Sequence, residues 1–127
     1  MPELPEVETV KRGLEPVLTG SSFIAVHLNR HNLRSPFPTD MIDRLIGKTC
    51  IGLRRRGKYV WIDLSSGETL VVHLGMSGSF TINPSTSKKH DHVIFETNHG
   101  DRIVYNDPRC FGMMFFVKTG EESEHQA

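Results

Sequence analysis

The chain has 127 residues with 15 basic and 15 acidic side chains, so it is long enough for one compact domain and carries no net charge when its histidines are neutral. A hydrophobic fraction of 37% and a charged fraction of 24% exclude a disordered composition, and no apolar stretch approaches the roughly 18 residues of a membrane span. The spacing of Cys50 and Cys110 matches neither a disulfide framework nor a zinc site, so we expect two reduced thiols in a soluble cytoplasmic protein.

Two helices are expected in the first third of the chain. Apolar side chains recur at helical spacing over residues 5–19, where Pro5 suits a first turn and Gly20 suits a C-terminal cap. Pro16 lacks a backbone donor and is expected to loosen the last turn of this helix. A second, shorter helix is predicted over residues 39–46.

The rest of the chain predicts short β-strands that are rich in Val, Ile, Phe and Tyr and are divided by turn residues. They cover residues 23–29, 50–56, 58–64, 69–74, 78–82, 92–97, 102–106 and 113–118. Many short strands with frequent turns favour a β-sandwich or barrel, whose ends or edges the two helices would cover. The expected fold class is therefore mainly β with two α-helices.

Basic side chains gather in the middle of this neutral chain, whereas acids collect at its two ends. The basic group comprises Arg54, Arg55, Arg56, Lys58, Lys88, Lys89 and His90. This distribution is compatible with one basic face that binds nucleic acid, and equally with charges spread over a solvated surface.

The N-terminus offers a nucleophile. Proline at position 2 is small enough for Met1 to be removed, which would expose a secondary amine, and an ordinary α-amino group has a pKa of about 7.7–8.0. Such an amine can attack a sugar carbon and form an iminium ion, and Glu3 beside it could supply a proton. If Met1 is retained, the Pro2 nitrogen is an amide and cannot attack. Glu3 is equally ordinary near a helix N-terminus, where the helix dipole favours acids.

Four segments, taken in order, resemble the formamidopyrimidine-DNA glycosylase family. PELPEVET is similar to the opening signature of its bacterial members, RRGKY to a basic turn with a catalytic lysine, HLGMSG to an intercalation loop and DPRCFG to a second wedge loop. These segments are residues 2–9, 55–59, 73–78 and 107–112. The resemblance extends over the whole chain and implies the fold of the family's N-terminal domain.

By this resemblance, Pro2 is expected to be the nucleophile that forms a Schiff base with the damaged nucleotide, with Glu3 as the proton donor. Lys58 follows a glycine at an expected hairpin bend and would assist strand cleavage by β-elimination. Without the resemblance, Lys58 is equally well explained as a solvent-facing charge.

Further residues are expected to contact DNA. An enzyme acting on a base within a duplex must extrude the nucleotide, and a wedge side chain can offset that cost by filling the vacated stack. Met76 and Phe111 lie beside glycines, which suits a wedge on a flexible loop better than a core position. Arg109 is expected to hydrogen-bond the orphaned cytosine or, alternatively, to pair with Asp107. His90 is expected near the DNA backbone.

No cofactor is expected in this chain. Residues 88–92 contain a His-Asp-His run, but neighbours on a strand point to opposite faces, so we expect no metal there. The resemblance departs at Cys110, where the family commonly has a basic residue. Family members also continue with a helix–two-turn–helix segment and a zinc finger, which these residues lack. We expect residues 1–118 to be the N-terminal catalytic β-sandwich domain and residues 119–127 to be a tail or the start of a linker.

The resemblance implies a base-excision repair glycosylase with AP lyase activity in the bacterial cytosol. Its expected partner is damaged double-stranded DNA, its expected lesions are oxidised purines such as 8-oxoguanine and formamidopyrimidines, and its expected state is a monomer. The 127 residues alone are expected to be weakly active or inactive. Two alternatives stay open, namely an endonuclease VIII-type glycosylase for oxidised pyrimidines and a non-catalytic DNA-binding module.

Overall fold

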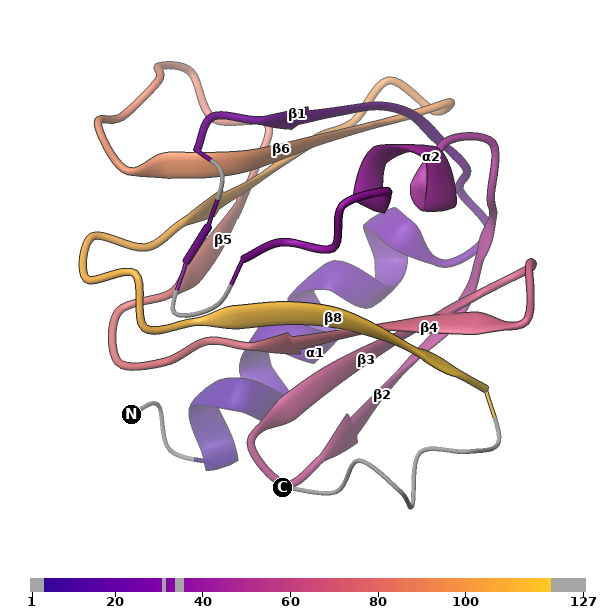
Figure 1. Cartoon of the computed structure of the whole chain (residues 1–127), viewed down its shortest axis with the longest axis horizontal. Coiled ribbons are helices and arrows are strands. Elements are labelled where there is room, and N and C mark those ends of the chain that lie inside the picture. The colour runs from indigo at the N-terminus through magenta and orange to yellow at the C-terminus, as the bar shows by residue number, and fades with distance from the viewer. Residues whose placement is uncertain (1–3, 31, 34–35, 120–127) are drawn as a thin grey trace.

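The structure is a computed structural model that describes residues 4–30, 32–33 and 36–119. This part of the chain contains two helices and eight strands, in the order that the sequence predicts (Figure 1). They are α1 (Leu4–Leu18), β1 (Phe23–Leu28), α2 (Met41–Leu45), β2 (Cys50–Arg56), β3 (Tyr59–Leu64), β4 (Glu68–His73), β5 (Ser79–Ile82), β6 (Asp91–Thr97), β7 (Arg102–Asn106) and β8 (Met113–Lys118).

The strands form two antiparallel sheets that face each other. One sheet has the order β1-β6-β7-β5 and the other has the order β2-β3-β4-β8. Alternate residues of each strand face the space between the sheets, as in β3, where Val60, Ile62 and Leu64 all belong to the core. Phe95 and Tyr105 enter the same core from the other sheet. The prediction of a mainly β sandwich with two helices is confirmed.

The helices close the sandwich at its edges. Val7, Leu14 and Leu18 of α1 recur at helical spacing and are buried in the core, and this helix packs against β2 and β3. The shorter α2 packs against β1. Gly20 has a φ of 83°, a conformation that suits glycine after the end of a helix. Neither helix is long and apolar enough to cross a membrane.

Two loops pass from one sheet to the other at the same end of the sandwich. The loop of residues 74–78 joins β4 to β5, and the loop of residues 107–112 joins β7 to β8. Since β4 pairs with β8 and β5 pairs with β7, the two loops cross side by side. The β2–β3 turn at residues 57–58 and the turn at residues 88–90 lie at this end too, because Tyr59 pairs with His73 and Asp91 pairs with Asn106. We call these four segments the crossover end.

Candidate functional site

The crossover end holds every predicted site residue that the structure describes. They are Lys58 in the β2–β3 turn, Met76 in the first crossover loop, His90 in the turn before β6, and Arg109 and Phe111 in the second crossover loop. Pro2 and Glu3 lie outside the described residues, and the description begins at Leu4, the first residue of α1. The fold therefore gathers residues that are far apart in the sequence.

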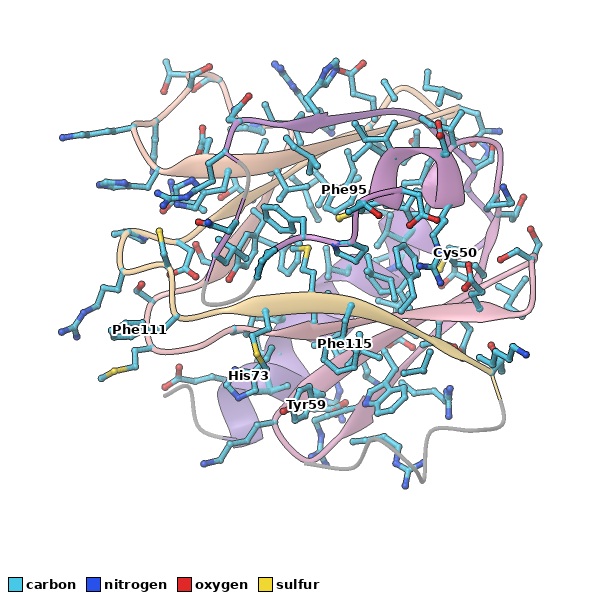
Figure 2. All side chains as sticks on the ribbon, in the orientation of Figure 1. Cys50, Tyr59, His73, Phe95, Phe111 and Phe115 are labelled. Carbon is cyan, nitrogen blue, oxygen red and sulfur yellow. The ribbon has the colours of Figure 1, made fainter. Side chains whose placement is uncertain are left out.

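Met76 and Phe111 are both strongly exposed. Their relative exposures are 52% and 45%, which excludes the alternative that they are core residues. In Figure 2, Phe111 lies at the crossover end, on the opposite side of the view from the buried Cys50. The Arg109 guanidinium carbon lies 5.6 Å from the centroid of the Phe111 ring, in the range of a cation–π contact. An apolar wedge and a planar cation thus stand together on one loop.

The glycines beside these side chains serve close packing. A Cβ on Gly75 would lie only 2.5 Å from the carbonyl carbon of Phe111, in the neighbouring loop. A Cβ on Gly112 would collide with the Tyr105 hydroxyl oxygen and lie 2.8 Å from the His73 carbonyl oxygen. At Gly75 the backbones of the two loops are therefore packed against each other, and at Gly112 the second loop is packed against the ends of β4 and β7.

A buried carboxylate lies beneath both loops. Asp107 is fully buried, and its Oδ1 accepts hydrogen bonds from Ser77 Oγ at 2.7 Å and from the Cys110 N–H at 3.1 Å. Its Oδ2 accepts from the Tyr105 hydroxyl and from the Gly112 N–H, both at 2.9 Å. Burial, followed by the negative charge of Asp107, raises the pKa of Tyr105, so its hydroxyl remains protonated and donates.

The hydrogen bonds of the Asp107 carboxylate are therefore made to groups other than the Arg109 guanidinium. Among the described residues no ion pair joins Arg109 to Asp107, and the Arg109 N–H donates to Ser77 Oγ at 3.1 Å. The Arg109 side chain is exposed and lies over Phe111 instead. This placement leaves the guanidinium available to a ligand at the crossover end.

The turn that carries His90 is fixed to the same group of residues. The His90 carbonyl oxygen accepts from the Asp107 N–H at 3.1 Å, and the Asp91 carboxylate accepts from the Lys88 N–H at 2.7 Å. The Asn106 side chain donates to the other Asp91 oxygen at 2.8 Å. Within the described ranges, no group of three His, Cys, Asp or Glu side chains is placed to hold a metal ion.

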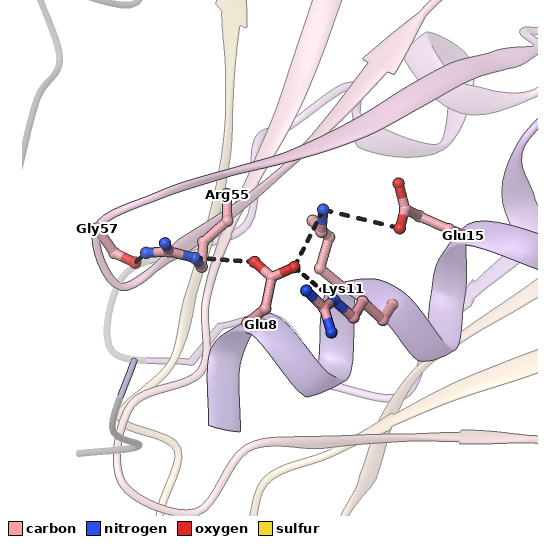
Figure 3. A network of polar contacts seen from close by, with 6 residues as sticks. Glu8, Lys11, Glu15, Arg55 and Gly57 are labelled. Carbon is pink, nitrogen blue, oxygen red and sulfur yellow. Dashed lines mark hydrogen bonds and ion pairs between the residues drawn. The ribbon is translucent and has the colours of Figure 1, made fainter. Parts of the chain in front are cut away.

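The start of α1 is tied to the turn that carries Lys58 (Figure 3). The Glu8 carboxylate accepts from Arg55 Nε at 3.0 Å, and Arg55 Nη1 donates to the Gly57 carbonyl oxygen at 3.1 Å. Arg12 and Lys11 contact the other Glu8 oxygen at 2.9 and 3.3 Å. The hydrogen bond from Arg55 is the main cause that lowers the pKa of Glu8 below its ordinary value of 4.5.

Glu8→Gln is expected to lower the melting temperature at pH 7 and to leave it nearly unchanged in acid. A carboxylate whose pKa is lowered by folding stabilises the protein above its unfolded pKa, and this contribution is lost as the pH falls through the lowered value. The difference between the two proteins should therefore shrink below pH 4.5, the ordinary pKa of Glu8. Thermal unfolding followed by circular dichroism, from about pH 3 to about pH 7, would measure the difference in melting temperature.

The matched control is Glu15→Gln, because Glu15 pairs only with Lys11 of the same helix, at 3.7 Å, among the described contacts. A single exposed pair within one helix contributes little. An equal effect of both substitutions at pH 7 would show that the link from α1 to the β2–β3 turn adds nothing to stability.

The expected basic face is only partly realised. Arg54 is paired with Asp63, with nitrogen–oxygen distances of 2.8 and 2.7 Å, and Arg55 is paired with Glu8. These two charges hold the fold together. Lys58, by contrast, is exposed at the crossover end.

Sequence reasoning missed the residues that hold the loops, chiefly Ser77, Tyr105 and the carboxylate role of Asp107. A local signal existed for Asp107, because an aspartate that accepts from the N–H three residues later is common in turns. Tyr105 and Gly112 are also close to Asp107 in sequence, whereas Ser77 lies 30 residues away in the first crossover loop, which only the sheet pairing brings near.

Comparison with known sequences identifies relatives over the whole chain. Residues 1–114 match the family model described as the formamidopyrimidine-DNA glycosylase N-terminal domain. Among curated proteins named formamidopyrimidine-DNA glycosylase, that of Ruegeria pomeroyi is 48% identical over 136 residues, which cover 99% of this chain and 48% of the relative. That of Bartonella henselae is 50% identical over 139 residues, which cover 98% of this chain and 48% of the relative. The chain spans about half the length of the curated relatives it matches.

Solved structures agree with these sequence matches. The Lactococcus lactis formamidopyrimidine-DNA glycosylase bound non-covalently to DNA with an AP site superimposes with a TM-score of 0.88 at 31% identity, covering 98% of this chain and 48% of that chain. A complex of the same enzyme with DNA containing FAPY-dG gives a TM-score of 0.87, covering 97% of this chain and 47% of that chain. On the strength of the matched sequence and the shared fold, the chain belongs to the formamidopyrimidine-DNA glycosylase family and carries its N-terminal domain.

Proposed function

We propose that this chain is the nucleophile-bearing and wedge-bearing part of a base-excision repair DNA glycosylase with AP lyase activity. The observation that carries the proposal is the crossover end, where exposed Met76, Phe111 and Arg109 stand at the same end of the sandwich as Lys58. The Glu8–Arg55 link brings the first turns of α1, which follow Pro2 and Glu3 in sequence, toward the Lys58 turn. We propose that the amine of Pro2 acts on DNA held at this end of the sandwich.

The proposed reaction uses the secondary amine of Pro2. It attacks the sugar carbon that bears the damaged base, so that a carbon–nitrogen bond forms as the bond to the base breaks. The base leaves with that electron pair and takes up a proton to balance the one that the amine loses, and Glu3 donates the proton that the ring oxygen takes up on ring opening. The resulting iminium cation draws electrons from the adjacent carbon. Loss of a proton there expels the 3′ phosphate by β-elimination, a step that Lys58 would assist from the β2–β3 turn. The damaged strand is nicked and the base released.

Damaged DNA is the proposed partner, and the wedge residues are its proposed contacts. Exposed Met76 and Phe111 would fill the stack vacated by an extruded nucleotide, while Arg109 would contact the orphaned base and His90 the backbone. The Lactococcus lactis relatives were solved with AP-site and FAPY-dG DNA, which supports oxidised purines as substrates. Met76 and the Arg109/Phe111 pair lie on two separate loops, which favours this lesion class over the oxidised pyrimidines of endonuclease VIII-type enzymes.

Residues 1–118 are proposed as the catalytic domain, since β8 ends at Lys118, and residues 119–127 as a tail or linker. The curated relatives are about twice as long, so a protein of their length has further surface with which to grip DNA. We expect the 127 residues alone to turn over glycosylase substrates weakly or not at all. We propose no role among the described residues for a zinc ion, which a zinc finger outside this chain would hold.

Met76→Ala and Phe111→Ala are each expected to lower the preference for abasic-site DNA over undamaged DNA about tenfold, because one base-stacking side chain contributes about 1–3 kcal/mol. Binding to the undamaged duplex should stay unchanged, since a wedge enters only where a base has left the stack. Fluorescence anisotropy with labelled duplexes, one carrying a tetrahydrofuran abasic analogue, measures both affinities.

Ile24→Ala is the matched control, because Ile24 is 58% exposed but lies on β1, outside the crossover end. It should change neither affinity. If all three substitutions acted alike, or if the unmutated chain failed to distinguish the two duplexes, the crossover end would not be the lesion-binding site.

A further inference from the structure

We propose that Ser77 and Asp107 lock the two crossover loops into one rigid unit, so that Met76 and Phe111 enter DNA together at a fixed separation. This inference rests on the proposed function for its DNA part, but the lock itself is a property of the free protein. Ser77 and Asp107 are positioning residues in this scheme, because neither has to touch the substrate.

Ser77 is the side chain that joins the loops directly. It follows Met76 in the first crossover loop, and both partners of its hydroxyl lie in the second. Its Oγ donates to Asp107 Oδ1 at 2.7 Å and accepts from the Arg109 N–H at 3.1 Å. The Ser77 hydroxyl therefore connects the first loop, next to Met76, to the backbone of Arg109. The Arg109 side chain in turn stacks on Phe111.

Asp107 makes the lock rigid. A buried carboxylate is costly unless each oxygen is hydrogen-bonded, and here the four donors come from three segments. Ser77 belongs to the first loop, Cys110 and Gly112 to the second, and Tyr105 to β7. Displacing either loop would remove a donor from a buried negative charge. The loops are thus held in one arrangement rather than moving independently.

The close contact at Gly75 leaves the two loops little room to shift relative to each other. Gly75 has a φ of 65°, and the space where a Cβ would stand is filled by the backbone of Phe111 and Gly112. At Gly75 the backbone of the first loop therefore rests directly on the backbone of the second. Rigid placement of two wedges lowers the entropic cost of inserting both into the base stack.

The lock can be tested without DNA by amide hydrogen exchange in Ser77→Ala. The Arg109 N–H loses its acceptor and should exchange at least about tenfold faster, while the Gly112 N–H, still bonded to Asp107, should keep its rate. Ser79→Ala is the matched control, because this serine lies two residues on, is exposed, and has no hydrogen bond to either loop among the described contacts. An unchanged Arg109 rate in Ser77→Ala would overturn the lock.

The DNA part is tested by a double-mutant cycle on binding to the abasic-site duplex. If the loops act as one unit, the effects of Met76→Ala and Phe111→Ala should be non-additive by about three-fold or more, and they should become additive in the Ser77→Ala background. Ser77→Ala should also weaken abasic-site binding while leaving undamaged DNA unaffected, a selectivity that simple destabilisation would not produce.

The outcomes are separable. Additive wedge effects in the unmutated background would overturn joint insertion even if the exchange data support the lock. No preference for the abasic duplex in the unmutated chain would overturn the proposed function and joint insertion together, whereas the lock between the loops is judged by measurements that need no DNA.

Discussion

If Pro2 is the nucleophile, the chain with a free Pro2 amine is expected to form a covalent adduct with abasic-site DNA in the presence of borohydride, and blocking this amine is expected to abolish the adduct. Acylation by Met1, or by any residue placed ahead of Pro2, turns this nitrogen into an amide whose lone pair is delocalised and no longer attacks carbon. The unblocked chain should be trapped and the extended chain should not. Intact mass spectrometry must first show which molecules have lost Met1.

Pro2→Gly provides a second and subtler variant. A secondary amine necessarily gives a cationic iminium, whereas the primary amine of glycine gives an imine that is neutral until protonated, so trapping should fall strongly. A blocked chain that is still trapped would contradict the proposal and point to another amine, with Lys58 the first to replace. No adduct from a chain with free Pro2 that still binds abasic DNA would favour the alternative of a non-catalytic binding module for these 127 residues.

Gly112→Ala is expected to lower the free energy of unfolding by about 3 kcal/mol. Its Cβ would collide with the Tyr105 hydroxyl and lie within 2.8 Å of the His73 carbonyl and 2.9 Å of Asp107 Oδ2. Two of these neighbours are fixed by the sheets, and Tyr105 is fully buried, so none can easily give way. Urea unfolding monitored by circular dichroism would report the loss as a lower midpoint.

Gly52→Ala is the matched control for that measurement. Gly52 lies in β2 with an ordinary φ, and a Cβ there meets nothing within 4 Å. Alanine should be neutral or slightly stabilising, because it reduces the freedom of the unfolded chain. Equal midpoints for Gly112→Ala and Gly52→Ala would mean that the loops are not packed as described, and the lock between them would lose its basis.

The sequence by itself determined the elements and the family. The short run of β-branched and aromatic residues in YVWIDL marks β3, and the helical spacing of apolar residues marks α1, because both signals depend only on nearby residues. The motifs HLGMSG and DPRCFG also predicted the two loops and the side chains that they expose. Prediction succeeded where the physical cause lies within a few neighbouring residues.

The arrangement of the loops was decided only by tertiary structure. Ser77 and Asp107 are 30 residues apart, and Glu8 and Arg55 are 47 apart, so no local pattern announces either contact. The pairing of β4 with β8 and of β5 with β7 sets the loops side by side. The close contacts at Gly75 and Gly112 could not be predicted either, because the space around a glycine depends on which distant backbone the sheets bring against it.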